Sequence, residues 1–332
     1  MKKSKKRKVL ITGGAGYVGS RLIPKLIKEN FSVIVYDTFW YGRHVLPGDK
    51  DETLKCVQGD IRDIQKLENL FEDVSDVIHL ACISNDPSFD LNPALGRSIN
   101  LDAFEPLVKL AKINGVTRFI YASSSSVYGV KLEENVTEDL TTNPLTDYSR
   151  FKVDCENILM EFIASDFTCT IIRPATICGF SPRQRFDLSV NILTNHAINN
   201  NKITVYGGSQ FRPNIHIEDM VDCYIALLNA DPKVINSKIY NIGTDNLTMD
   251  SIATEVQKYL PRAKIVHEGT NDLRSYRINS AKIEKEIGFR CRRKVGDAIQ
   301  ELVEAFRKNI FQDSLQNSIY FNIKRMQELG IE

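Results

Sequence analysis

The sequence predicts an α/β fold in which helices cover both faces of a parallel sheet, followed by a smaller α/β domain. The first half alternates short apolar segments with segments in which apolar residues recur at helical spacing. A glycine-rich turn joins the first apolar segment to the first helical one. Beyond residue 175 the loops lengthen and the elements shorten. Strands that alternate with helices are typical of a doubly wound parallel sheet, and the later change indicates a second, smaller unit.

The first elements lie in residues 8–37. Residues 9–12 are an apolar strand, and residues 13–16 read Gly-Gly-Ala-Gly. Residues 17–30 have helical spacing, and residues 32–36 form a second apolar strand. This order predicts a βαβ unit, which is the repeating unit of a parallel sheet.

The alternation continues along the chain. A predicted strand ends in Gly-Asp within residues 55–63, residues 76–82 and 118–123 are predicted strands, and residues 94–115 are a predicted helix. The segment FIYASSSSVYG, residues 119–129, therefore begins inside a strand and leaves it at four consecutive serines. Ligands of doubly wound sheets bind beyond the carboxyl ends of the strands. We therefore expect these serines to border a binding site.

Three glycines in the first turn predict a dinucleotide site. Gly13, Gly16 and Gly19 follow the spacing GxxGxxG between a strand and a helix. Because these residues lack side chains, the backbone can turn sharply and its amides can approach a pyrophosphate. Asp37 ends the second strand 18 residues after Gly19, where a carboxylate binds ribose hydroxyls and repels a 2′-phosphate. The sequence therefore predicts NAD rather than NADP as the cofactor.

A tyrosine and a lysine in the helix predicted near residue 148 have the spacing of a catalytic pair. Tyr148 and Lys152 are four residues apart, so their side chains lie on one face of the helix. An ammonium beside a phenol favours the phenolate, and the positive ring of NAD⁺ would add to this effect. We interpret Tyr148 as a general base that works near neutral pH. The alternative is an amphipathic helix that carries both residues by chance.

Together these motifs resemble the extended short-chain dehydrogenases, in particular the NAD-dependent nucleotide-sugar epimerase/dehydratase family. The resemblance covers nearly the whole chain and lies in TGGAGYVG, GDIRD, HLA, SSSSVYG, YSRFK, IIRPATICG and ITVYGGSQFRPNIHIEDM. It implies a Rossmann domain in residues 1–175, which binds NAD and carries the catalytic residues. Residues 176–332 are then mainly a nucleotide-sugar-binding domain, whose chain partly re-enters the first sheet.

The resemblance also assigns roles to individual residues. It makes Ser124 the catalytic hydroxyl, Tyr148 the base and Lys152 its partner, which also binds the nicotinamide ribose. The other cofactor-binding residues are then Gly13, Gly16, Tyr17 and Val18 at the pyrophosphate, Asp37 at the ribose, Asp60 and Ile61 at the adenine, Leu80, Ala81 and Cys82 along the cofactor, and Asn100, which braces the site.

The residues after Ser124 distinguish the reactions of the family. In the family pattern, dehydratases carry Asp-Glu at the next two positions, decarboxylases carry Glu at the second, and 3,5-epimerase/reductases carry Cys there. This chain has Ser125 and Ser126. Four serines before Val-Tyr-Gly instead resemble sugar-nucleotide 4-epimerases, including some that act on hexuronic acids. We therefore expect a 4-epimerase that forms a transient 4-keto sugar.

The second half supplies most of the predicted substrate site. The predicted substrate-binding residues are Ser124, Asn85, Thr176, Arg183, Asn191, Tyr206, Arg212 and Arg274. Arg183 and Arg185 precede a helix predicted from Asp187, where two cations and free amides suit a diphosphate. A solvated basic loop is the alternative. Thr176 and Cys178 stand where the family usually has Asn and an aromatic residue.

Two arginines are the expected diphosphate ligands, and a tyrosine the expected partner of the base. Arg212 matches the diphosphate arginine of the family, although Pro213 replaces the Asp that commonly follows it. A second diphosphate arginine of hexose 4-epimerases falls on Gly269, and Arg274 is its expected substitute. Tyr206 is the expected stacking partner of the nucleotide base.

Composition restricts the partners. With 43 basic and 42 acidic residues among 332, the net charge favours neither nucleic acid nor a membrane surface. We interpret the basic leader MKKSKKRK as a solvated tail. No segment approaches the roughly 20 apolar residues of a membrane-spanning helix. Seven cysteines without CxxC spacing argue against disulfides and zinc sites, so we expect no metal and a cytoplasmic location.

The resemblance also implies a homodimer that pairs two helices of each subunit across a two-fold axis. These helices are residues 101–114 and 148–165, and their apolar faces include Phe104, Leu107, Val153, Leu159 and Phe162. The alternative is that these faces pack only on the sheet of their own subunit.

Two other functions stay open. One is a different nucleotide-sugar enzyme of the same fold, a 4,6-dehydratase, 3,5-epimerase, reductase or decarboxylase. Asp86, Cys82 or Cys178 would then give the additional acid or base. Asn85 and Asp86 follow a predicted strand end and would lie beside the sugar, or they form only a turn. The other is a binding protein without turnover, which would not need Ser124 in register with the tyrosine and lysine.

Overall fold

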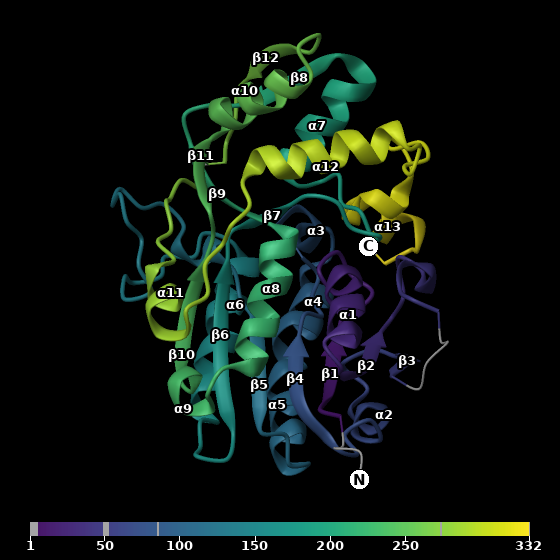
Figure 1. The fold of residues 1–332 in the computed structure, drawn as a ribbon, viewed down its shortest axis with the longest axis vertical. Helices are drawn as coiled ribbons and strands as arrows, with labels where there is room; N and C mark the ends of the chain where they lie inside the picture. Colours follow the sequence, from purple (N-terminus) through teal and green to yellow (C-terminus); the bar gives the residue numbers. More distant parts are fainter. Residues whose placement is uncertain (1–5, 49–52, 85, 273, 332) are drawn as a thin grey trace.

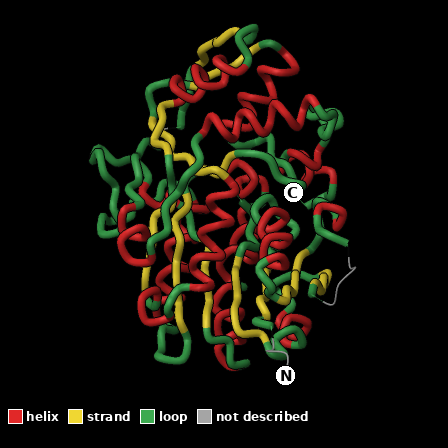
Figure 2. Tube along the Cα trace, in the orientation of Figure 1, coloured by secondary structure: helices red, strands yellow, loops and turns green. Residues whose placement is uncertain are grey.

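The computed structural model describes residues 6–48, 53–84, 86–272 and 274–331. The first five residues of the basic leader and the predicted substrate residue Asn85 lie outside this set. Within these ranges, seven parallel strands form a central sheet, and a smaller unit lies above it in the view of Figure 1. Figure 2 shows the same division, with the long strands flanked by helices in the lower part.

The central sheet has the strand order β10-β6-β5-β4-β1-β2-β3. Its strands are β1 (Lys8–Thr12), β2 (Ser32–Asp37), β3 (Leu54–Gln58), β4 (Val74–His79), β5 (Arg118–Ala122), β6 (Thr168–Pro174) and β10 (Lys238–Ile242). The order reverses between β1 and β4, which pair in parallel although β2 and β3 separate them in sequence. Ligands of doubly wound sheets bind at such a point. The arrangement confirms the predicted fold.

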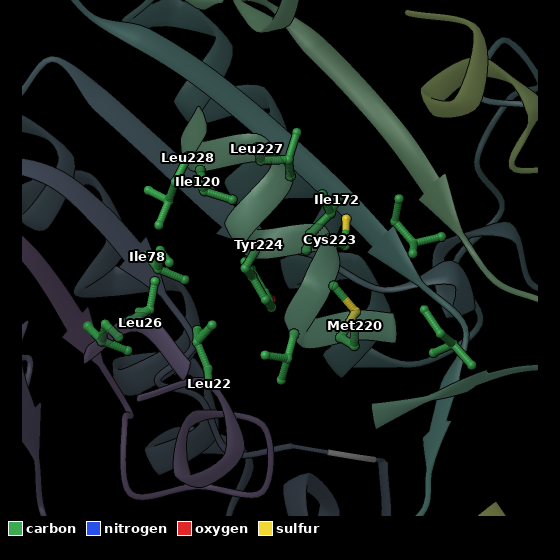
Figure 3. Packing of buried hydrophobic residues seen from close by; sticks show 14 of the residues in the cluster. Leu22, Leu26, Ile78, Ile120, Ile172, Met220, Cys223, Tyr224, Leu227 and Leu228 are labelled. Carbon is green, nitrogen blue, oxygen red and sulfur yellow. The ribbon is translucent and has the colours of Figure 1, made fainter. Parts of the chain in front are cut away.

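Helices cover both faces of this sheet because successive strand residues point to opposite sides. On β1, Val9 and Ile11 pack into one apolar cluster and Leu10 packs into another. The first cluster lies beneath α1 (Gly19–Lys28) and α8 (Ile217–Asn229), and Figure 3 shows side chains of both helices meeting those of the strands. The second cluster lies beneath α2 (Ile64–Glu68), α5 (Phe104–Ile113) and α6 (Asp147–Glu161) on the opposite face.

The helix predicted over residues 94–115 is interrupted. It consists of α4 (Pro93–Arg97), a π-helical turn (Ser98–Asp102) and α5 (Phe104–Ile113). π-Helical turns are rare and are frequent at functional sites. Here the turn carries Asn100, whose Oδ1 accepts from the amide of Ile83 at 2.8 Å while its Nδ2 donates to the carbonyl of Ile83 at 2.9 Å. Asn100 therefore fixes the chain that leaves β4.

The smaller unit is built on short sheets. In the described part of the chain, one sheet has the order β11-β9-β7 and the other pairs β12 with β8. These strands are β7 (Thr176–Cys178), β8 (Lys202–Tyr206), β9 (Phe211–His216), β11 (Asp245–Thr248) and β12 (Lys264–Glu268). Helices α7 (Ser189–Asn200), α10 (Met249–Tyr259) and α12 (Val295–Arg307) share one apolar cluster with β7, β8, β11 and β12. The chain returns to the central sheet at β10, which pairs with β6.

The remaining elements are short or peripheral. The helices not yet bounded are α3 (Asp86–Leu91), α9 (Pro232–Ile235), α11 (Ala281–Ile287) and α13 (Asn322–Glu328), with 3₁₀ turns at Arg43–Val45, Ser125–Tyr128 and Ser318–Tyr320. No helix within the described ranges is long and apolar enough to cross a membrane.

The helix faces expected at a dimer interface are largely used within the subunit. Phe104, Leu107 and Leu159 have 0% exposure and fill the cluster between α5, α6 and the sheet. Val153 and Phe162 are partly buried and pack against the two clusters of the central sheet. The prediction is therefore wrong for Phe104, Leu107 and Leu159, because these side chains cover the subunit's own sheet and are not available to a partner.

Candidate active site

A cavity of about 380 Å³ lies beyond the carboxyl ends of the central strands and is lined by both halves of the chain. The predicted site residues that line it are Gly13, Gly16, Tyr17, Val18, Asp37, Asp60, Ile61, Leu80, Ala81, Cys82, Ser124, Tyr148, Lys152, Thr176, Arg183, Arg212 and Arg274. Three other predicted site residues do not line this cavity, namely Asn100, Asn191 and Tyr206. Residues that are far apart in sequence thus meet around one space.

The glycine loop has the shape that a dinucleotide requires. Gly13 has φ of +73°, and a Cβ atom there would lie 2.6 Å from the backbone of Ala81. A Cβ atom at Gly19 would lie 2.2 Å from the carbonyl oxygen of Gly14, so this helix start also excludes any side chain. A Cβ atom at Gly16 would meet only the Gly13 oxygen, at 3.2 Å, and would otherwise fill open space. The loop therefore presents bare backbone to the cavity, which fits a pyrophosphate.

Asp37 closes the same end of the cavity. Its Oδ2 accepts from the amide of Ala15 at 2.8 Å, and its Oδ1 accepts from the amide of Phe39 at 2.7 Å. Burial raises the pKa of Asp37, while these two amides and the nearby charge of Arg183 act in the opposite direction. A carboxylate oxygen has more than one lone pair, so both oxygens can still accept from ribose hydroxyls.

We expect Asp37→Ala to weaken NAD binding about 10- to 100-fold, because hydrogen bonds to a charged group contribute about 1.5–3 kcal/mol each. The substitution should also remove the repulsion that disfavours a 2′-phosphate, so the preference for NAD over NADP should fall. Equilibrium titrations with both dinucleotides measure the two effects. Asp37→Asn keeps the shape of the side chain and isolates the contribution of charge. NADP binding as tight as NAD binding in the unaltered protein would contradict the assignment.

The predicted catalytic pair, Tyr148 and Lys152, lies on α6 at the cavity wall. The Nζ atom of Lys152 donates to the carbonyl oxygen of Ala122, at the end of β5, at 2.7 Å. The same Nζ atom lies 5.7 Å from the centroid of the Tyr148 ring. The strand end therefore holds a buried ammonium beside the phenol, as the four-residue spacing predicts.

The four serines have separate partners. Ser124 is in extended conformation before the 3₁₀ turn, and its Oγ accepts from the amide of Ser126 at 3.1 Å. The hydroxyls of Ser124 and Ser126 lie 2.8 Å apart, and the Ser149 hydroxyl donates to that of Ser126 at 3.1 Å. Ser125 contacts Tyr276 of the second half, with 3.3 Å between the hydroxyl oxygens. Ser124, Ser126 and Ser149 thus form a chain of hydroxyls that begins at the cavity wall.

Ser123 joins a buried ion pair behind this chain. Its hydroxyl donates to Glu156 on α6, and Glu156 accepts from Arg173 on β6 at 3.0 and 2.6 Å. Arg173 also donates to the hydroxyl of Tyr128 at 2.8 Å, and Tyr128 donates to Asn241 on β10 at 2.9 Å. This network links three elements of the sheet region to the start of the serine segment.

Arg212 and Arg274 meet at the end of the cavity that the second half supplies. Both lie beside Asp272, with 2.8 Å from Arg212 Nη2 and 2.7 Å from Arg274 Nη2 to the same carboxylate oxygen. Although burial opposes it, the two guanidinium groups lower the pKa of Asp272 to about 2. The pair of cations suits a diphosphate, which has the charge and geometry for such a fork.

Arg183 and Arg185, which precede α7, also line the cavity. Arg185 donates from Nε to Asp187 at 2.8 Å and from Nη1 to the hydroxyl of Ser84 at 3.1 Å. Arg183 lies over the ring of Tyr41, with 3.6 Å from its guanidinium carbon to the ring centroid. Both arginines are buried, so the predicted alternative of a solvated basic loop is wrong.

The other predicted residues are placed as follows. Asn191 is buried, and its amide donates to the hydroxyl of Tyr17 at 3.1 Å and to the carbonyl of Arg185 at 2.9 Å, so it positions cavity residues from behind. Tyr206 is 55% exposed and lies on the surface of β8. Thr176 lines the cavity at the start of β7. The role of each in substrate binding stays a prediction.

The two cysteines considered for acid or base chemistry differ in position. Cys178 is 1% exposed, and its thiol donates to the carbonyl oxygen of Ile215 at 3.4 Å. Burial raises the pKa of Cys178, and nearby carboxylates add to the effect, so this thiol is disfavoured as a thiolate. Cys82 lines the cavity beside the glycine loop. Asp86 is the first residue of α3, four positions further along the chain.

Several cavity residues were missed by sequence reasoning. They are Trp40 and Tyr41 after β2, Ser84 after β4, Tyr224 on α8, Tyr276, and Asn322 and Met326 on α13. The aromatic pair three and four residues after Asp37 and the tyrosine two residues after Arg274 were the available signals, since each lies within four positions of a predicted site residue. No pattern marked Asn322 and Met326, because their place at the cavity depends on how the last helix packs.

Comparison with known proteins agrees with this site. Residues 9–243 match the model of the NAD dependent epimerase/dehydratase family. The chain is 28% identical to a UDP-glucose 4-epimerase of Lactobacillus helveticus over 255 residues, which cover 71% of this chain and 76% of that protein. It is 31% identical to a dTDP-D-glucose 4,6-dehydratase of Dictyostelium discoideum over 259 residues, which cover 72% of this chain and 58% of that protein.

The solved structures agree as well. The structure of MoeE5 in complex with UDP-glucuronic acid and NAD superposes with a TM-score of 0.80 at 26% identity, covering 91% of this chain and 99% of that one. The predicted glycine loop, Asp37 and the paired Tyr148 and Lys152 all line the cavity described above. The chain therefore belongs to the NAD-dependent epimerase/dehydratase family of nucleotide-sugar enzymes, and its cofactor is NAD.

Proposed function

We propose that the protein is an epimerase that inverts carbon 4 of a nucleotide-diphosphate sugar through a transient 4-keto sugar. The observation that carries the proposal is the chain of hydroxyls from Ser124 through Ser126 to Ser149. Removal of water needs a further acid and base beside the catalytic hydroxyl, and the decarboxylases of the family pattern carry a Glu there. Ser125 and Ser126 occupy those positions, and neither hydroxyl replaces a carboxylate in that role.

In the proposed reaction each residue of the site has its own task. NAD, when bound, supplies the acceptor and donor of the hydride. Tyr148 accepts the proton of the 4-hydroxyl and later returns it, while the Ser124 hydroxyl donates a hydrogen bond to the same sugar oxygen. Lys152, held by the carbonyl of Ala122, keeps a positive charge beside the phenol. No other acid or base is required for inversion at one carbon.

Inversion also requires the 4-keto sugar to present its opposite face before the hydrogen returns. The site must therefore hold the diphosphate firmly and the hexose loosely. Arg212 and Arg274 provide the firm end, since both line the cavity and are already oriented by Asp272. The serine hydroxyls that border the sugar can exchange hydrogen bonds at little cost as the sugar turns.

We predict that turnover in deuterated water gives a product inverted at carbon 4 without carbon-bound deuterium, because the hydrogen removed from that carbon is the one that returns. UDP-glucose and UDP-glucuronic acid are the first substrates to offer, and Arg185 gives a reason to include the acid. Its Nη2 atom has no hydrogen-bond partner among the described residues, and its charge acts on Tyr148. Proton NMR of the product measures the outcome.

The same experiment separates the alternatives. Deuterium at carbon 3 or carbon 5 would show enolisation and would favour the other chemistries, with Asp86 or Cys82 as the additional group. Loss of the 6-hydroxyl would identify a dehydratase. An incubation with Tyr148→Phe controls for exchange that does not depend on the site. Binding of a nucleotide sugar without any conversion, under all conditions tested, would support the non-catalytic alternative.

The proposal includes a cytoplasmic homodimer. All seven cysteines are within the described ranges and none forms a disulfide, which supports a reducing compartment. Ile113 at the end of α5 is 83% exposed, and Phe162 after α6 is only partly buried, so some apolar surface of this helix pair faces outward. Sedimentation at micromolar concentration tests the assembly, and a species of monomer mass alone would contradict it.

A further inference from the structure

The cations around the cavity fall into separate groups. The lysine and arginine side chains among its described lining residues are Lys152, Arg183, Arg185, Arg212 and Arg274. Lys152 lies beside the catalytic phenol, and Arg212 and Arg274 share Asp272. Arg185 is paired with Asp187. Arg183 has no carboxylate partner of its own in the described part of the chain, which sets it apart from the other arginines.

Arg183 is buried but incompletely bonded. It is 3% exposed, and its Nη2 donates to Oδ1 of Asn322 at 2.5 Å. Its Nε and Nη1 atoms have no hydrogen-bond partner within the described protein. A buried donor without a partner is costly and therefore uncommon in native structures. Because Arg183 lines the cavity, an acceptor supplied by a ligand would satisfy these two groups.

The surroundings of Arg183 point to the cofactor. The charge of Arg183 acts to lower the pKa of Asp37, the carboxylate expected at the adenosine ribose. Its guanidinium group lies over the ring of Tyr41, which follows Asp37 by four residues in the same loop. Arg212 and Arg274 belong to the opposite end, since Tyr276, two residues after Arg274, contacts Ser125 in the serine segment. Its proximity to Tyr41 and Asp37 thus groups Arg183 with the cofactor end of the cavity.

Helix α13 completes this end of the cavity. Asn322 accepts from the Tyr41 hydroxyl at 3.0 Å, and its Nδ2 donates to the carbonyl and the hydroxyl of Ser84 at 3.1 and 2.9 Å. Arg325 donates to the carbonyl oxygen of Trp40 at 2.5 Å, and Met326 is 1% exposed at the cavity wall. The last helix of the chain (yellow in Figure 1) therefore packs on the loop that follows Asp37.

We propose that Arg183 binds the adenosine-diphosphate half of NAD, rather than the substrate diphosphate, and that Asn322 and Tyr41 position it as a clamp. Nε and Nη1 of Arg183 donate to ribose or phosphate oxygens of the cofactor. Asn322 is a positioning residue, because it touches Arg183 and Tyr41 and holds both against the chain after β4. The clamp replaces our assignment of Arg183 to the substrate.

The clamp makes NAD a firmly retained group. The glycine loop holds the pyrophosphate from one side, and the arginine with α13 closes the other side. Retention suits a reaction that begins and ends with the cofactor in the same oxidation state. The proposal rests on the family's cofactor and not on the position of the sugar that reacts, so it stands or falls separately from the proposed 4-epimerase activity.

The test compares cofactor binding with nucleotide binding in three variants. Arg183→Lys keeps a charge but loses the fork and the stacking on Tyr41, Asn322→Ala removes the positioning amide, and Arg212→Lys is the matched substitution at the substrate end. NAD content after purification is measured by denaturing extraction. Affinities of the cofactor-free protein for NAD, and of the NAD-loaded protein for UDP or dTDP, are measured by calorimetry.

We expect Arg183→Lys and Asn322→Ala to weaken NAD binding about tenfold or more and to change nucleotide binding less than about twofold. Arg212→Lys should give the opposite pattern. Gln327→Ala, on the exposed side of α13, should change neither affinity. Weaker nucleotide binding with unchanged NAD affinity in Arg183→Lys would overturn the proposal, and so would unchanged NAD affinity in both clamp variants. If Arg183→Lys does not fold, Asn322→Ala decides the question alone.

Discussion

Replacement of Tyr148 by Phe should reduce turnover about 100-fold or more while NAD stays bound. The substitution removes one oxygen atom from the cavity wall and leaves the ring in place. Lys152 keeps its hydrogen bond to the carbonyl of Ala122, so the ammonium does not move. What is lost is the group that accepts the proton of the 4-hydroxyl, and water in a closed site is a much weaker base. The turnover number of the purified variant, with its NAD content, measures the effect.

Tyr121→Phe is the matched control for this prediction. Tyr121 lies at the end of β5 close to the same site, but it is 2% exposed and is not among the residues that line the cavity. Removing its hydroxyl should leave turnover within a few-fold of the unaltered protein. If Tyr148→Phe were nearly as active as the unaltered protein, Tyr148 would not be the base. If both variants lost activity equally, the loss would reflect disturbed packing rather than proton transfer.

The cofactor loop could be predicted because its constraints are local. Gly13 needs a positive φ and Gly19 needs a close backbone approach, and both requirements show as glycine in the sequence. Asp37 follows from its place at the end of the second strand. Tyr148 and Lys152 could be paired because one helical turn separates them. In each case the residues that act together are close in sequence, so their spacing determines their geometry.

The features that could not be predicted depend on packing between distant segments. Asn322 contacts Arg183 across 139 positions of the sequence, and nothing near Asn322 distinguishes it from a surface asparagine. Ser125 meets Tyr276 across 151 positions. The apolar residues of α5 show that the helix has a buried face, but their pattern is the same whether that face covers the sheet or a second subunit. In the structure, the Leu107 side chain packs against the sheet of its own subunit.

The interrupted helix illustrates the same limit on a smaller scale. Apolar residues recur at helical spacing through residues 94–115, and a π-helical turn changes that spacing by only one residue. The π-helical turn can be recognised only in the structure, where Asn100 hydrogen-bonds to the backbone amide and carbonyl of Ile83. A sequence pattern averages over several turns, so a single inserted residue at a functional position does not alter it.

Glu156→Ala should destabilise the protein by about 3–5 kcal/mol, as expected when one partner of a buried ion pair is removed. The side chains of Arg173 and Glu156 are 5% and 4% exposed, so the arginine would keep its charge without water or a carboxylate. Its remaining side-chain partner, the hydroxyl of Tyr128, is neutral. The hydroxyl of Ser123 would lose its acceptor at the same time. Urea unfolding at equilibrium, followed by circular dichroism, measures the change.

Two further variants decide whether the unpaired charge is the cause. Glu161→Ala removes an exposed carboxylate from the same helix and should change stability by less than about 0.5 kcal/mol. The double variant Glu156→Leu with Arg173→Met replaces the pair by apolar groups, and it should be more stable than Glu156→Ala because no buried charge is left alone. A loss below about 1 kcal/mol in Glu156→Ala would show that water reaches Arg173. If the double variant were no more stable than Glu156→Ala, the loss of stability would be due to packing at the end of β6, where Arg173 is linked to the serine segment through Glu156.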